Sequence, residues 1–120
     1  MKTKNAKKVK GVKFTGGTSY RTVLKSDGMG FAMMKTVIEK GGAYLWHYKN
    51  HKEACYCISG IGILEDLESG EIHQIEEGVT YLVDNHQRHK FTAITEVILI
   101  SVFNPPLRGD ETHDKEGNYI

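Results

Sequence analysis

Short runs in which apolar and polar residues alternate cover most of this chain. Residues 53–59, for example, place Glu53, Cys55 and Cys57 on one face, and an alanine, a tyrosine and an isoleucine on the other. A period of two residues is that of a β-strand. No long segment carries the 3.6-residue apolar period of an amphipathic helix. The pattern therefore predicts a chain built from strands.

Glycine-containing turn signals separate most of these runs, and the prolines at 105 and 106 end the last of them, because proline cannot donate a ladder hydrogen bond. Many short strands at close spacing are typical of an all-β barrel or sandwich. We expect one such fold, with no internal repeat or linker. The predicted strands cover residues 20–25, 31–39, 43–48, 53–59, 61–67, 71–75, 79–83, 90–93 and 96–103.

Length and charge limit the number of domains and the kinds of partner. A chain of 120 residues fits one domain with a modest core, so residues 1–120 are expected to form a single domain. The first ten residues carry five lysines and no acid, and residues 1–18 are expected to be a flexible arm. No aromatic residue interleaves with these lysines, and the formal net charge is only +1. Neither nucleic acid nor an acidic membrane is therefore an expected partner.

The expected location is the cytoplasm. The sequence has no run of eighteen apolar residues and no signal-peptide pattern. Its two cysteines, Cys55 and Cys57, lie two residues apart on one predicted strand, where a disulfide between them is geometrically poor. Reduced thiols in the core fit a cytoplasmic protein.

Expected burial and strand position make three residues candidates for binding a metal ion. Glu53 shares a strand face with two cysteines, and a buried carboxylate needs either an ionic partner or a metal ion. Tyr81 lies in an apolar run and is either a packed core residue or a ligand. His89 precedes a strand and is either a ligand or an exposed residue, with His86 as its competitor.

The spacing of residues 41–60 also indicates a metal site. Gly41, His47, Glu53 and Gly60 follow the first motif of the cupin superfamily, G-x5-H-x-H-x3or4-E-x6-G, with Lys49 in place of the second histidine. The resemblance implies a small, jelly-roll-like β-barrel with a metal inside. Gly70, Glu76, Gly78, Tyr81 and Asn85 fall at the spacings of the second cupin motif, G-x5-P-x-G-x2-H-x3-N, with Glu76 in the proline place and Tyr81 in the histidine place.

Longer blocks resemble the ectoine synthases. They are D-G-M-G-F at 27–31, H-Y-K-N-H-K-E-A-C-Y-C-I-S-G at 47–60, Y-L-V-D-N-H-Q-R-H at 81–89, V-F-N-P-P-L-R-G at 102–109 and E-T-H-D-K-E-G-N-Y at 111–119. Members of that family are cytoplasmic, typically homodimeric cupins that need ferrous iron. They are lyases that convert N-γ-acetyl-L-2,4-diaminobutyrate to the cyclic amidine ectoine, a compatible solute made under osmotic stress, with loss of water.

This resemblance implies roles for particular residues. The iron ligands would be Glu53, Tyr81 and His89. Another divalent metal is an alternative, because a ligand set of oxygen and nitrogen accepts several ions. Acid–base chemistry would fall to Tyr48, Glu111 and His113. The residues implied in binding the small-molecule substrate are Arg21, Thr36, Tyr48, Ser101, Phe103, Glu111 and His113.

Two positions depart from the family pattern. Gly17 stands where ectoine synthases have tryptophan, and Ser101 stands where they usually have cysteine. The loss of an indole from the substrate pocket would remove a large contact surface. Two other functions therefore stay open. One is a related cupin that cyclises or hydrolyses another small N-acetyl amine, and the other is a non-catalytic cupin that binds a small ligand.

Overall fold

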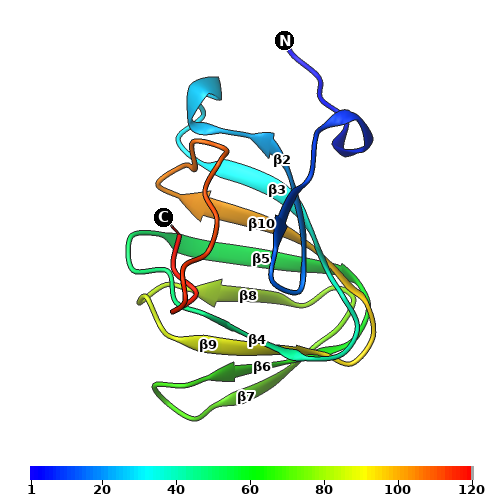
Figure 1. Ribbon diagram of the computed structural model, residues 1–120, viewed down its shortest axis with the longest axis vertical. Helices are drawn as coiled ribbons and strands as arrows, with labels where there is room; N and C mark the ends of the chain where they lie inside the picture. The colour runs from blue at the N-terminus through cyan, green and yellow to red at the C-terminus, as the bar shows by residue number, and fades with distance from the viewer. Residues whose placement is uncertain (120) are drawn as a thin grey trace.

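Two antiparallel sheets build the protein, and the computed structural model describes residues 1–119 (Figure 1). Helical structure in that range is limited to two 3-10 turns, η1 (Ala6–Lys8) and η2 (Lys25–Asp27). The prediction of an all-β fold is confirmed. The larger sheet contains, in spatial order, β1 (Val12–Phe14), β2 (Gly17–Val23), β3 (Ala32–Ile38), β10 (Val97–Asn104), β5 (Lys52–Ser59) and β8 (Thr80–Val83). The smaller sheet contains β4 (Ala43–Trp46), β9 (His89–Ala93), β6 (Gly62–Asp66) and β7 (Ile72–Ile75).

The predicted strands are all present, with ends that differ by a few residues. The structure adds one strand that the sequence pattern did not indicate, β1 at residues 12–14. Gly16 adopts a left-handed φ of 97°, which lets the chain reverse between Phe14 and Gly17. Residues 12–14 and 17–18, which were expected in the flexible arm, therefore lie in the larger sheet.

The position of the last strand, β10, brings the site residues together. Strand β10 lies between β3 and β5 although it is last in the sequence, as the central band of Figure 1 shows. Its register places Phe103 opposite Glu53 and Ser101 opposite Cys55. On the other side of β5, Cys55 is opposite Tyr81 of β8. Residues from three distant parts of the chain thereby share one interior face.

The interior of the two sheets is apolar, as the alternation predicted. Strands β3 and β10 bury every second residue, so that one face of each contributes to the core. Cys55 and Cys57 are both buried and unbridged, as expected. Burial of this alternating face provides the main driving force for the fold.

The segment after β10 runs across one end of the two sheets (red in Figure 1). Its Leu107 carbonyl accepts a hydrogen bond of 2.7 Å from Lys25 N–H beside the larger sheet. Its Gly117 carbonyl accepts one of 3.1 Å from His47 N–H, directly after β4 of the smaller sheet. The segment therefore links the two sheets at this end. Across residues 1–119, no helix is long and apolar enough to span a membrane.

Candidate active site

A cavity of about 20 Å³ lies between the two sheets and collects most of the residues singled out in the sequence. Seven of them line it: Thr36, Tyr48, Glu53, Tyr81, Ser101, Phe103 and His113. Strands β3, β5, β8 and β10 supply five of these side chains through inward-facing positions of their alternation. The remaining two, Tyr48 and His113, come from the segment after β4 and from the C-terminal segment.

Glu53 and His89 form a pair of buried ionisable side chains near this cavity. Both are buried, and Glu53 Oε1 lies 4.0 Å from His89 Nε2. Burial raises the pKa of the Glu53 carboxyl to about 7, an effect that the Cys55 thiol opposes by hydrogen bonding. Burial lowers the pKa of His89, so its imidazole is neutral at pH 7. Because the imidazole is neutral, the contact is not an ion pair.

These two groups fit a metal ion. Within the described residues, neither Glu53 Oε1 nor His89 Nε2 has a hydrogen-bond partner. Orphaned buried polar atoms are costly, and a bound cation would satisfy both. His89 Nδ1 lies 3.0 Å from the Gln87 carbonyl, which fixes the ring so that Nε2 is presented as the free ligand atom.

The third candidate ligand is a tyrosine. Burial raises the pKa of the Tyr81 phenol well above its usual value, and the neighbouring Cys55 and Glu53 act in the same direction. A cation would reverse this effect, since it favours the phenolate. No cluster of three His, Cys, Asp or Glu side chains suited to a metal occurs in residues 1–119. A site here therefore combines one carboxylate, one imidazole and the Tyr81 phenol.

Tyr48 and His113 form a second pair at the cavity wall. The Tyr48 hydroxyl lies 2.8 Å from His113 Nε2. Burial, with a further contribution from the Arg21 charge, lowers the pKa of His113 to about 4, so the ring is neutral at pH 7. His113 Nδ1 is buried without a partner in the described structure. In the tautomer in which Tyr48 donates to Nε2, this Nδ1–H is a free donor.

Two hydroxyl groups of the cavity lining lie together. Thr36 Oγ1 and Ser101 Oγ are 2.9 Å apart, and the Cys55 thiol donates to Ser101 Oγ at 3.4 Å. All three side chains are buried. They give the cavity a small polar patch on strands β3, β10 and β5.

Arg21 and Glu111 lie outside the cavity lining, in contrast to the expectation for substrate-binding residues. Arg21 donates to the carbonyls of Gly109 at 3.0 Å and Glu111 at 2.7 Å. The Glu111 carboxylate accepts backbone N–H bonds from Arg108 at 2.7 Å and Gly109 at 2.8 Å. These backbone bonds outweigh burial and lower the pKa of Glu111. The structure thus uses both residues to fix the C-terminal segment that carries His113.

Five further residues line the cavity that were not expected there. Ser19 and Leu99 could have been found by strand alternation, since each lies two residues from a candidate, Arg21 or Ser101. The three aromatic residues had no such signal, because their places depend on tertiary packing. The five are Phe14, Ser19, Trp46, Leu99 and Tyr119.

The Gly17 position is not an empty pocket. A Cβ atom added at Gly17 would lie 2.2 Å from the Val37 carbonyl oxygen and 2.7 Å from Phe14 Cζ. The Phe14 ring covers this glycine from the neighbouring strand. The contact surface that seemed lost with the family tryptophan is therefore filled by another aromatic ring.

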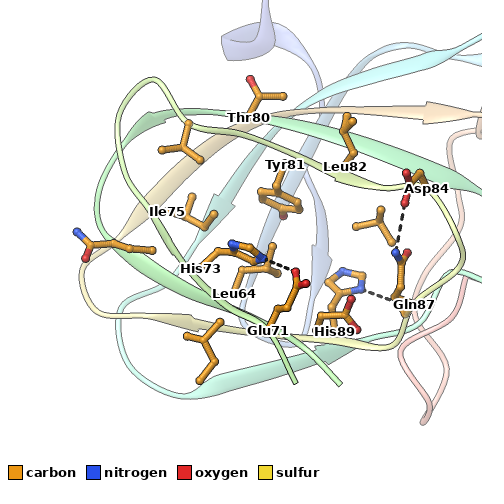
Figure 2. A pocket seen from close by; sticks show the side chains of 15 residues that line it. Leu64, Glu71, His73, Ile75, Thr80, Tyr81, Leu82, Asp84, Gln87 and His89 are labelled. Carbon is orange, nitrogen blue, oxygen red and sulfur yellow. Dashed lines mark hydrogen bonds and ion pairs between the residues drawn. The ribbon is translucent and has the colours of Figure 1, made fainter. Parts of the chain in front are cut away.

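Among the described residues, His113 is the one histidine that lines this cavity, and the predicted ligand His89 lies outside its lining. His86 Nδ1 lies 2.9 Å from the Tyr48 carbonyl, and His51 Nδ1 lies 2.9 Å from the Pro105 carbonyl. His73 is exposed and lies 3.2 Å from the Glu71 carboxylate. Figure 2 shows His73 in a separate cleft of about 620 Å³ that Tyr81 also lines. That cleft lies between the unpaired edges of β7 and β8 and is also lined by His89, whereas Glu53 and His113 do not line it.

The arrangement of sheets around an interior polar site defines the protein class. Two antiparallel sheets that enclose a carboxylate, an imidazole and a phenol are the architecture of a cupin. A solved RmlC-like cupin from Shewanella frigidimarina superposes with a TM-score of 0.71 at 20% identity, over 89% of this chain and 92% of that one. This likeness shows the cupin fold.

Sequence comparison narrows the class to one family. The ectoine synthase family profile matches residues 1–120, so the chain belongs to the ectoine synthase family. L-ectoine synthase of Desulfosudis oleivorans is 50% identical over 105 residues, which span 87% of this chain and 81% of the relative. That of Alkalilimnicola ehrlichii is 47% identical over 105 residues, spanning 87% and 80%. The crystal structure of ectoine synthase from P. lautus superposes with a TM-score of 0.86 at 38% identity, over 91% and 81%.

Proposed function

We propose that this protein is an L-ectoine synthase, a lyase that closes N-γ-acetyl-L-2,4-diaminobutyrate into ectoine with loss of water. Membership of the family over the whole chain supports this assignment. The observation that carries the mechanism is the cavity, which Glu53 lines together with the Tyr48–His113 pair, while His89 lies 4.0 Å from Glu53. The side-chain roles below belong to the same proposal.

The metal site is formed by Glu53, Tyr81 and His89, and its ion is Fe²⁺. The two orphaned ligand atoms and the oxygen and nitrogen donor set support a divalent cation, and the choice of iron rests on the family resemblance. When bound, the ion supplies a Lewis acid for the amide oxygen of the substrate. The other three groups at the wall, Tyr48, His113 and Ser101, hold the substrate in a folded shape.

The reaction joins two ends of one flexible molecule. The α-amine forms a bond to the acetyl carbon, and the former amide oxygen leaves as water with two protons that started on the nitrogens. A cavity that holds both ends close together raises their effective concentration. Burial also favours the neutral, nucleophilic amine over the ammonium ion.

Tyr48 and His113 assist the departure of the former amide oxygen through hydrogen bonding. Because burial keeps His113 neutral, its ring can accept from the Tyr48 hydroxyl and donate from Nδ1 at the same time. The Nδ1–H is a hydrogen-bond donor for the leaving oxygen, and Tyr48 fixes the tautomer. Arg21 and Glu111 act through position, since they anchor the segment on which His113 lies.

Apolar walls favour dehydration over hydrolysis. Phe103 and Leu99 are each 1% exposed, and they line the cavity together with Trp46. Bulk water excluded by these side chains cannot compete with the amine for the acetyl carbon. The polar patch of Thr36 and Ser101 lies on the same wall and contacts the polar groups of the substrate.

The decisive experiment uses purified protein, Fe²⁺ and N-γ-acetyl-L-2,4-diaminobutyrate without oxygen, with chromatography for ectoine and for free acetate. We expect ectoine from the wild type and none from Glu53→Ala. Acetate without ectoine would mean a hydrolase. Substrate binding without turnover would mean a ligand-binding cupin, and conversion of a different N-acetyl amine alone would mean a retuned enzyme.

We also propose a homodimer in the cytoplasm that supplies a compatible solute under osmotic stress. Strands β7 and β8 leave unpaired edges, and their Ile72 and Leu82 are 63% and 64% exposed. Pairing of exposed edges between two copies would cover such surface. Light scattering should give about twice the chain mass of 13.5 kDa. A monomer at micromolar concentration would contradict the dimer. The buried, unbridged Cys55 and Cys57 fit a reducing compartment.

A further inference from the structure

The cavity is too small for the reaction proposed for it. Its volume of about 20 Å³ gives room for about one water molecule, which needs about 10–15 Å³. A diamino acid with an acyl group cannot enter unless one wall moves. The identity of that wall follows from the surroundings of the cavity.

A second, larger chamber adjoins the cavity on the side of β1 and β4. It has a volume of about 640 Å³ and is lined in part by Lys13, Tyr44 and Lys115. Three rings line both spaces and therefore separate them: Phe14, Trp46 and His113. The cleft of Figure 2 shares only Tyr81 with the cavity, whereas the outer chamber shares these three rings with it. The outer chamber is thus the better route to the site.

Two of the three separating rings are firmly held. Trp46 is 6% exposed and packs against Phe91 and Tyr44, with ring centroids 6.2 Å away in each case. His113 is bound to Tyr48 at 2.8 Å and stacks on the Tyr119 ring with centroids 4.6 Å apart. Movement of either ring would break several of these contacts.

Phe14 is the least restrained ring of the three. It is only half-buried and lies on the three-residue edge strand β1, which pairs with β2 alone. Its ring touches Trp46 and His113 edge-on, with centroids 5.9 and 5.4 Å away. Gly17 opposite leaves room for this ring, because a side chain at Gly17 would collide with it. Short edge strands open at low cost in free energy.

We propose that Phe14 is a specificity-determining residue, whose ring closes the inner cavity toward the outer chamber and limits the length of the acylated diamino acid that fits. The inference rests on the proposed function and names a residue that determines its substrate range. The ring moves aside to admit the substrate and returns to form the apolar wall beside His113. Truncation of this ring should therefore let the cavity accept a longer molecule.

The first test compares wild type, Phe14→Ala and Lys13→Ala on three substrates. These are N-γ-acetyl-2,4-diaminobutyrate and two homologues longer by one methylene, N-γ-propionyl-2,4-diaminobutyrate and N-δ-acetylornithine. One methylene in an apolar pocket changes kcat/KM by about tenfold or more. Phe14→Ala should shift the ratio of kcat/KM for homologue over parent by that factor for at least one homologue. Lys13→Ala, an exposed neighbour on β1 that lines the outer chamber but not the inner cavity, should leave both ratios unchanged. Unchanged ratios in Phe14→Ala would overturn the proposal.

A second readout does not depend on turnover. Trp46 is the single tryptophan of the chain, and Phe14 packs against it. Acrylamide should quench its fluorescence more strongly in Phe14→Ala than in wild type or Lys13→Ala. Equal quenching in all three would overturn the closing role of Phe14. If wild type makes no product from any of the three substrates, the proposed function fails, and the quenching result alone then decides the role of Phe14. Phe14→Leu, which keeps an apolar side chain, replaces the alanine variant if circular dichroism shows that the latter is unfolded.

Discussion

Glu53→Gln offers the sharpest test of the site, because it removes a buried charge and almost nothing else. Glutamine has nearly the same size and shape as glutamate, and Glu53 Oε1 has no hydrogen-bond partner to lose among the described residues. Without metal, the wild type must bury an ionised carboxylate above neutral pH. The variant avoids that cost, so the substitution is expected to stabilise the metal-free protein at high pH.

The size and sign follow from the pKa of Glu53. Folding raises it from 4.5 to about 7, so the folded state holds a proton that the unfolded state releases between these two values. The stability of the metal-free wild type therefore falls as pH rises through that window and levels off above pH 7. The shift corresponds to about 3 kcal/mol. The variant should lack this loss.

The assay is urea unfolding of both proteins with a chelator present, at pH 5 and at pH 8. Other titrating groups are common to both chains, so the change in their stability difference between the two pH values isolates Glu53. We expect Glu53→Gln to gain about 3 kcal/mol on the wild type between pH 5 and pH 8. Addition of Fe²⁺ without oxygen should stabilise the wild type at pH 8 and leave the variant unaffected. Parallel pH profiles for the two proteins would refute the reasoning.

Three other outcomes are expected. Iron content measured by plasma emission should fall to near zero in His89→Ala and stay at the wild-type value in His86→Ala; equal iron in both would place the metal elsewhere. Tyr48→Phe should lower kcat by about a hundredfold with little change in KM, because it loses the hydrogen bond to His113; an unchanged kcat would remove Tyr48 from the mechanism. Gly17→Ala should cost about 1–3 kcal/mol in urea unfolding through its clash with Val37 and Phe14, and no loss would mean that the hairpin adapts freely.

Local pattern determined much of the fold. A strand shows its two faces through alternation alone, so residues 53–59 revealed their buried side without any tertiary information. Glycine turns marked most boundaries of the predicted strands, although β1 was not indicated. The spacings of the cupin motifs and the family resemblance also pointed to Glu53, Tyr81 and His89, and two of these carry the orphaned atoms.

Tertiary structure decided which side chains meet. Phe14 lay in a segment that resembled a flexible arm, and only pairing with β2 places its ring over Gly17 and beside His113. Glu111 had the chemistry of a general base, but the turn at residues 108–111 occupies both of its oxygens. Alternation describes one strand at a time, whereas these contacts join residues up to about a hundred positions apart. Their energies depend on packing and backbone geometry that no local pattern in the sequence contains.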